Sequence, residues 1–122
     1  MKVKIDTKEK FHVITIREQV LSANMTEELS KMLLPFLKNE IKNVILKLDP
    51  VKKIDEAIAT TFLNMQQTFY DNKASFVICG IQKTVQETFN KLKLSGIINV
   101  TPTESEAWDI VQMEEIEREF LD

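Results

Sequence analysis

Three short apolar runs, each separated from the next by a helical pattern, limit this chain to an α/β fold. The runs cover residues 44–48, 75–79 and 96–100. Between them, apolar residues recur every three or four positions, at Ile58, Phe62, Met65 and Phe69 and again at Val85, Phe89 and Leu92. Strands that alternate with helices in this way pair in parallel, with the helices on the faces of the sheet.

The N-terminal residues predict a β-hairpin and a helix. Residues 2–7 and 11–17 alternate apolar and polar side chains around a polar stretch, which favours two antiparallel strands. Asn24 is predicted to cap the following helix, with Glu27 reaching back. Pro35 lacks an N–H and should kink or shorten this helix. The apolar face expected for it comprises Leu29, Met32, Leu33, Phe36 and Leu37.

The last helix is predicted to begin at the capping box Thr103-Glu104-Ser105-Glu106. Its apolar residues are Ala107, Ile110 and Val111 and later Ile116 and Phe120. The predicted order is therefore β-β-α-β-α-β-α-β-α. It corresponds to one domain over residues 1–122, with a mixed sheet of about five strands and about four helices. The hairpin would form one part of the sheet, and the later strands would be parallel.

Composition excludes several functional classes. No apolar run is long enough to span a membrane, so no membrane insertion is expected. Cys79 is the single cysteine, which rules out an intrachain disulfide and favours a reducing, cytoplasmic setting. Residues 104–122 carry eight acidic residues and one arginine, a net charge of −7, so residues 1–103 carry +4 of the total of −3. The lysines are scattered and predict no nucleic-acid partner.

The residue types that catalysis needs do not converge in this sequence. His12, the single histidine, lies in a predicted strand and is interpreted as a residue on the sheet surface. Cys79 ends an apolar run and is interpreted as a core residue. No metal-binding spacing or glycine-rich phosphate loop occurs. We therefore expect no catalytic residues, no metal and no cofactor, and predict that the protein is not an enzyme.

Residues 51–61 stand out because they leave a parallel strand and enter a helix at the carboxyl end of the sheet, where open α/β proteins place their sites. Asp55 is a natural N-cap, and Glu56 suits the positive end of the helix dipole. The alternative interpretation is a well-capped helix with no further role.

At this point the sequence resembles STAS domains, the family of the anti-sigma factor antagonists and of related sulphate-transporter domains. The resemblance rests on the order of five features. These are the strand before the turn, the turn 54–58 with its apolar helix, the strand 76–80, and the segments 85–89 and 96–98. It extends over nearly the whole chain in element order and is best from Asn43 to Val111. It implies a protein that binds a regulatory partner.

The resemblance also implies a phosphorylation switch that this chain lacks. The family's turn typically reads Asp-Ser-Ser-Gly, and a partner kinase phosphorylates the second hydroxyl residue. Asp55 matches the aspartate, whereas Glu56, Ala57 and Ile58 occupy the next three positions. Alanine has no oxygen to phosphorylate, so the usual switch is lost at Ala57. Thr60 and Thr61 are interpreted as ordinary helix residues.

We therefore expect a non-catalytic module that docks on a regulatory protein, such as an anti-sigma factor kinase, through the turn 50–61. The expected partner-binding residues are Lys53, Asp55, Glu56, Ala57 and Ile58. Docking should be constitutive, and permanent mimicry of a phosphorylated state by Glu56 is the alternative. Two other functions stay open: a STAS subunit docked on an ABC-type transporter ATPase, and a nucleotide-binding or small-molecule-binding domain.

The acidic C-terminal extension, about residues 113–122, continues an apolar stripe through Met113, Ile116, Phe120 and Leu121. The stripe predicts a helix that packs on something, with its acidic residues toward water. One interpretation is that it folds back on the domain's own sheet. The other is that the stripe, together with Trp108, forms a homodimer or a partner contact.

Overall fold

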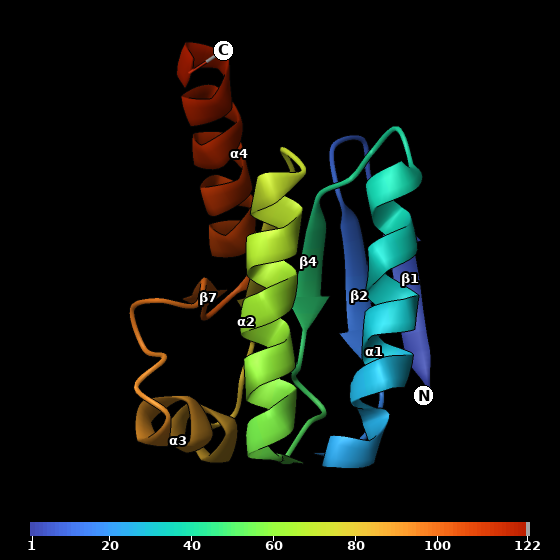
Figure 1. Ribbon diagram of the computed structural model, residues 1–122, viewed down its shortest axis with the longest axis vertical. Helices are drawn as coiled ribbons and strands as arrows, with labels where there is room; N and C mark the ends of the chain where they lie inside the picture. The colour runs from blue at the N-terminus through green and yellow to red at the C-terminus, as the bar shows by residue number, and fades with distance from the viewer. Residues whose placement is uncertain (122) are drawn as a thin grey trace.

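The computed structural model describes residues 1–121 and is built around a five-stranded mixed sheet (Figure 1). In sheet order the strands are β1 (Val3–Thr7), β2 (His12–Ile16), β4 (Val44–Lys47), β6 (Phe76–Cys79) and β7 (Val100–Thr101). The first pair is antiparallel, and every later pair is parallel. The predicted hairpin and the predicted mixed sheet are confirmed.

The described residues form four α-helices, in agreement with the predicted number; three lie between strands, and the fourth follows the last strand. They are α1 (Thr26–Leu33), α2 (Glu56–Asp71), α3 (Lys83–Lys91) and α4 (Glu104–Leu121). Helices α1 and α2 lie in front of the sheet in Figure 1, with α3 beside the lower end of α2, and α4 packs on the opposite face. No helix within residues 1–121 combines the length and apolar composition needed to cross a membrane.

Strands β4 and β6 are buried on both faces, which explains their continuous apolar sequence. Val44 and Leu46 of β4 face the larger core beneath α1, α2 and α3, whereas Ile45 faces a smaller core against α4. Phe62 and Phe69 of α2 are fully buried in the larger core. Each such side chain stabilises the fold by about 1.5–3 kcal/mol relative to an exposed position.

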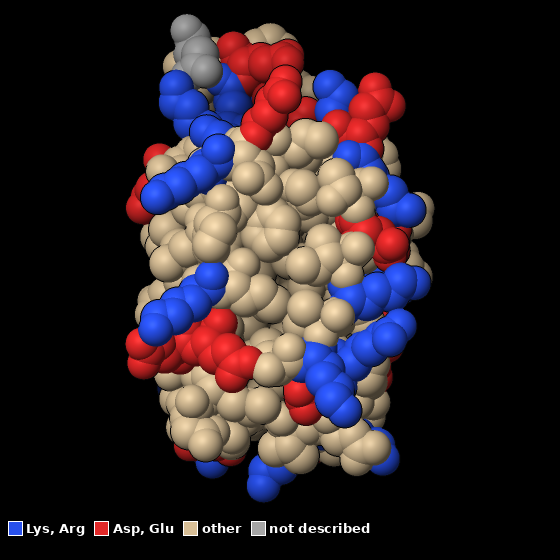
Figure 2. Space-filling view, turned by 90° about the vertical axis from the view of Figure 1, so that its right-hand side faces the viewer, with Lys and Arg blue, Asp and Glu red and all other residues tan. Residues whose placement is uncertain are grey.

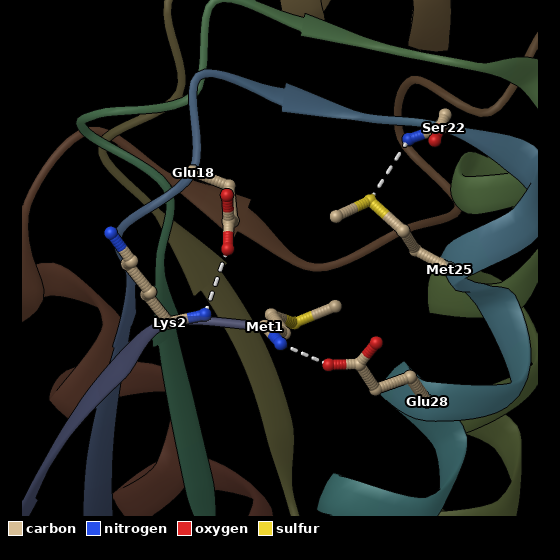
Figure 3. Close-up of polar contacts among 6 residues, drawn as sticks. All are labelled: Met1, Lys2, Glu18, Ser22, Met25 and Glu28. Carbon is tan, nitrogen blue, oxygen red and sulfur yellow. Dashed lines mark hydrogen bonds and ion pairs between the residues drawn. The ribbon is translucent and has the colours of Figure 1, made fainter.

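The entry into α1 differs from the prediction. Asn24 does not cap α1, because a short 3-10 helix, η1 (Ala23–Met25), precedes it and contains Asn24. Asn24 Oδ1 instead accepts a hydrogen bond from Ser22 Oγ, at 2.5 Å. The Ser22 backbone N–H lies 3.3 Å from Met25 Sδ across the same turn (Figure 3). The effect of Pro35 is as predicted, since α1 stops at Leu33 and continues as the 3-10 helix η2 (Leu34–Lys38).

Two further differences from the sequence prediction concern strands: one predicted strand is shorter than expected, and one small sheet was not predicted. The strand expected at 96–100 is limited to Val100–Thr101, because Gly96 adopts a φ of +83° and Ile98 donates its N–H to the Leu94 carbonyl within a turn. A separate two-stranded parallel sheet joins β3 (Val20–Leu21) to β5 (Lys53–Ile54). Strands of two residues are too short to show a periodicity.

His12 is buried and not on the sheet surface, so that prediction was wrong. Only 5% of the residue is exposed. Its Nε2 donates to the Ile41 carbonyl at 2.8 Å, and its Nδ1 lies 3.0 Å from Thr7 Oγ1. Its ring packs on Phe36 with centroids 4.6 Å apart. Both ring nitrogens have partners within the domain, and this gives His12 a structural role.

The start of α4 is as predicted, but its second half is not. Thr103 Oγ1 accepts the Glu106 N–H at 3.2 Å, and Ala107 and Val111 are buried against the sheet. Beyond them α4 extends past the end of the sheet (Figure 1). Its apolar stripe is exposed there, so the interpretation that the stripe folds back on the domain's own sheet was wrong. The interface interpretation stays a prediction. Asp122, the last residue of the predicted extension, lies outside the described residues.

Polar contacts also attach the N-terminus to α1. The amino group of Met1 forms an ion pair with the Glu28 carboxylate, and the Lys2 N–H donates to Glu18 Oε2 at 2.8 Å (Figure 3).

Figure 2 shows the molecule from this side, with uncharged residues in the middle and charged residues of both signs along the borders. The lysines and arginines on this face are therefore dispersed, as the sequence analysis expected.

Asn43, at the start of β4, is a buried polar residue that joins three segments. Its Oδ1 accepts the Ser75 N–H at 2.8 Å. Its Nδ2 donates to the Lys10 carbonyl at 3.1 Å and to Glu115 Oε1 at 2.7 Å. The residue is 8% exposed, so little water is available to replace these bonds.

We expect Asn43→Ala to lower the free energy of unfolding by about 2–3 kcal/mol, because it leaves a buried N–H and a carboxylate without their partner. Urea denaturation measures this change. Asn64→Ala, on the exposed side of α2, is the matched control and should stay within about 0.5 kcal/mol of the wild type. Equal effects of the two substitutions would contradict the structural role of Asn43.

Candidate docking site

Residues 49–55, between β4 and α2, include β5 and expose Asp49, Lys52 and Lys53, whereas Val51 and Ile54 are buried. We call this segment the docking turn. It lies at the carboxyl end of β4, at the bottom of Figure 1, where α2 begins. On one side, the N–H groups of Lys52 and Lys53 donate to the Gln19 carbonyl at 2.8 and 3.2 Å. On the other side, Gln82 Nε2 donates to the Asp49 carbonyl at 2.8 Å, and the Thr84 hydroxyl donates to the Lys52 carbonyl.

These contacts hold the docking turn from both sides. Its backbone is hydrogen-bonded to the segment before β3 and to the start of α3, which are far apart in the sequence. Hydrogen bonds on both sides restrict the conformations that the turn can adopt. The surface it presents is therefore preorganised.

Asp55 occupies the N-cap position of α2, as predicted, but its carboxylate has a different partner from the one expected. Its Oδ2 accepts the N–H of Ala23 at 2.7 Å, and no side-chain bond to α2 itself is present. The Asp55 N–H donates to the Leu21 carbonyl at 2.9 Å. Asp55 therefore fixes η1 beside the start of α2 and brings the residues of η1 onto the same surface.

The structure brings four of the five predicted site residues together at the surface. Lys53, Glu56 and Ala57 are exposed, and Asp55 is partly buried. Ile58 has no exposed area and packs in the core, so any part it has in docking is indirect. The Glu56 carboxylate lies 3.8 Å from Lys91 Nζ of α3, which links the start of α2 to its neighbour.

The threonines after the turn behave as ordinary helix residues. Thr60 Oγ1 donates to the Glu56 carbonyl at 3.2 Å, and Thr61 Oγ1 donates to the Ala57 carbonyl at 2.8 Å. Such bonds to the carbonyl four residues earlier are common for threonine inside helices. Ala57, which the sequence analysis aligned with the family's acceptor residue, is exposed, and its side chain carries no oxygen.

Sequence reasoning did not identify the residues that border the site from other segments. Ala23 and Asn24 belong to η1, and Gln82, Lys83 and Thr84 begin α3. Only the tertiary contacts of Asp55, Gln82 and Thr84 with these segments reveal them. Their residue types are common in any helix start, so the sequence offered no signal that could have selected them.

The neighbouring strand end is tightly packed rather than reactive. Gly80 has a φ of +71°, and a Cβ added there would lie 2.5 Å from Asp49 Oδ1. Burial raises the pKa of the Cys79 thiol to about 11, and the negative charge of Asp49 adds to this shift. The thiol is therefore protonated at neutral pH, in line with a core role. Among the described residues, no three His, Cys, Asp or Glu side chains gather in a way that could hold a metal ion.

Comparisons with solved structures show that other proteins share this fold. Solved structures with the same fold include a STAS-domain anti-sigma factor antagonist from Planctomyces limnophilus (13% identity, TM-score 0.76, covering 90% of this chain and 97% of that one). A variant of RsbS from Moorella thermoacetica has 17% identity and a TM-score of 0.72, with 92% and 96% of the two chains covered. SpoIIAA from Bacillus in its phosphorylated form has 14% identity and a TM-score of 0.64, with 90% and 99% covered.

At these identities the likeness to solved structures shows a shared fold. A separate comparison with curated protein sequences gave no match. The model of the STAS domain family matches residues 2–107, which is most of the chain. The predicted resemblance is thereby confirmed, and this chain belongs to the STAS domain family.

Proposed function

We propose that this STAS domain is a non-catalytic module that docks on a regulatory protein, such as an anti-sigma factor kinase. The contact surface comprises the docking turn, the exposed start of α2, η1 and the start of α3. The observation that carries the proposal is the double attachment of the docking turn, whose backbone bonds to Gln19 on one side and to Gln82 and Thr84 on the other. A preorganised surface loses little conformational entropy when a partner binds.

Exposed charges of both signs lie on this surface. Lys52, Lys53 and Lys83 are the exposed basic residues, and Asp49 and Glu56 are exposed acidic residues. Charges at the rim of an interface set the encounter rate and the choice of partner more than they set the affinity. A partner that places an acidic group near the lysines and a basic group near Glu56 fits this pattern.

Docking is constitutive in this proposal. SpoIIAA is known in a phosphorylated and an unphosphorylated form. In the present chain Ala57 provides no acceptor, and the hydroxyls of Thr60 and Thr61 are hydrogen-bonded inside α2. Glu56 is a weak substitute for a phosphate, because it carries one charge, lies one position away and is close to Lys91. Partner abundance would then control the interaction.

We expect Glu56→Lys to weaken binding to the partner kinase about tenfold, which corresponds to about 1.4 kcal/mol. Reversing an exposed charge should change the melting temperature little. Isothermal titration calorimetry with the copurified kinase measures the affinity. Glu9→Lys is the matched control, since Glu9 is exposed in the turn between β1 and β2.

Equal affinities of the wild type and Glu56→Lys would show that the docking surface lies elsewhere. Copurification with an ABC-type transporter ATPase in place of a kinase would reassign the partner class. In that case the same two substitutions would test the same surface against the ATPase.

A second expectation concerns phosphorylation. Incubation with the partner kinase and ATP should leave the wild-type chain unmodified, whereas Ala57→Ser should acquire one phosphate, because it restores a hydroxyl at an exposed position. Phosphopeptide mapping by mass spectrometry distinguishes the two. Stoichiometric phosphate on Thr60 or Thr61 of the wild type would contradict the loss of the switch.

A further inference from the structure

The second half of α4 presents its polar residues to the domain. Glu115 Oε1 accepts the Asn43 amide N–H at 2.7 Å, and Glu114 Oε2 accepts that of Asn99 at 3.1 Å. Arg118 Nη1 donates to Ser75 Oγ at 3.2 Å. These side chains follow Ala107 and Val111 on the same face of the helix, at helical spacing. The domain is therefore attached to this part of α4 by hydrogen bonds.

The apolar residues of the same segment face solvent. The exposed fractions are 55% for Met113, 54% for Ile116, 86% for Phe120 and 79% for Leu121. Met113, Ile116 and Phe120 are spaced at i, i+3 and i+7 and so share one side of the helix. We call these four residues the α4 apolar face. Surface helices of globular domains normally have the opposite orientation, and exposed apolar groups that gather in this way mark interaction surfaces.

Charge limits what can cover the α4 apolar face. The exposed charged residues of α4 within the described part of the chain are all acidic: Glu106, Asp109, Glu117 and Glu119. The one basic residue of the helix, Arg118, is turned inward to Ser75. A second copy of this chain would bring two acidic helices together, and an anionic lipid surface would be repelled. A basic partner meets opposite charge around the apolar contact.

We propose that the α4 apolar face binds a segment of a partner protein that presents apolar residues within a basic surround, such as a cationic amphipathic helix. The face lies at the opposite end of the molecule from the docking turn (Figure 1). Both surfaces are accessible at once, so the domain can connect two proteins. This binding site is independent of the function proposed above.

The test uses the full chain and two synthetic helical peptides. One consists of leucine and lysine in an amphipathic pattern, and the other has glutamate at every lysine position. Fluorescence anisotropy of the labelled peptides measures their dissociation constants. We expect the lysine peptide to bind at least about tenfold more tightly than the glutamate peptide.

The double variant Ile116→Ser, Phe120→Ser should weaken binding of the lysine peptide at least about tenfold, since it removes the centre of the apolar contact. Ile97→Ser is the matched control, because Ile97 is 59% exposed but lies in the loop before β7, and it should leave the affinity unchanged. Circular dichroism verifies the fold. If the double variant is unfolded, Glu117→Lys takes its place and should weaken binding severalfold through charge alone.

Three results would overturn the proposal. The first is equal binding by the wild type and the variant, and the second is equally tight binding of the glutamate peptide. The third is a wild-type dimer in light scattering that Phe120→Ser dissociates, because the occupant would then be a second copy. Glu56→Lys should leave the peptide affinity unchanged, so failure here is distinguishable from failure at the docking turn.

Discussion

Both faces of β4 and β6 are buried, and the other elements of the domain are arranged around this constraint. Val44 and Leu46 require a layer of helices on one side, which α1 and α2 provide. Ile45, Val77 and Cys79 require a cover on the other side, which the first turns of α4 provide. Because β2, β4, β6 and β7 are parallel, each connection between them leaves the sheet at its carboxyl edge and returns along one face to the opposite edge. The carboxyl edge is where the docking turn lies.

The docking turn derives its conformation from neighbours that the same topology brings to this edge. The connection after β2 contributes Gln19 and Ala23, and the connection after β6 contributes Gln82 and Thr84. Asp55 is the link between two helix starts, because its carboxylate serves η1 and its backbone begins α2. The exposed Ala57 and Glu56 therefore follow a turn that is fixed by hydrogen bonds to other segments.

At the other end of the molecule, polar contacts replace apolar packing. The sheet ends before α4 does, so beyond Val111 the helix has no apolar surface to cover. Asn43 and Ser75, next to the starts of β4 and β6, form hydrogen bonds with the helix instead. The Asn43 amide donates to Glu115, and Arg118 donates to the Ser75 hydroxyl. The apolar residues of the helix consequently face water. The same physical cause, the limited length of the strands, orients both halves of α4.

The sequence by itself determined the order of the main elements, the hairpin, the parallel strands and the absence of a hydroxyl at residue 57, because each is encoded by local periodicity or by a single residue type. Tertiary structure alone decided that His12 is buried, that Asp55 bonds to η1 and that Ile58 belongs to the core. It also decided that α4 turns Glu114 and Glu115 toward the domain. Periodicity shows that a helix has two faces. Which of them meets the domain depends on the surface that the rest of the fold places beside it, and here that surface is the polar amide of Asn43 and the hydroxyl of Ser75.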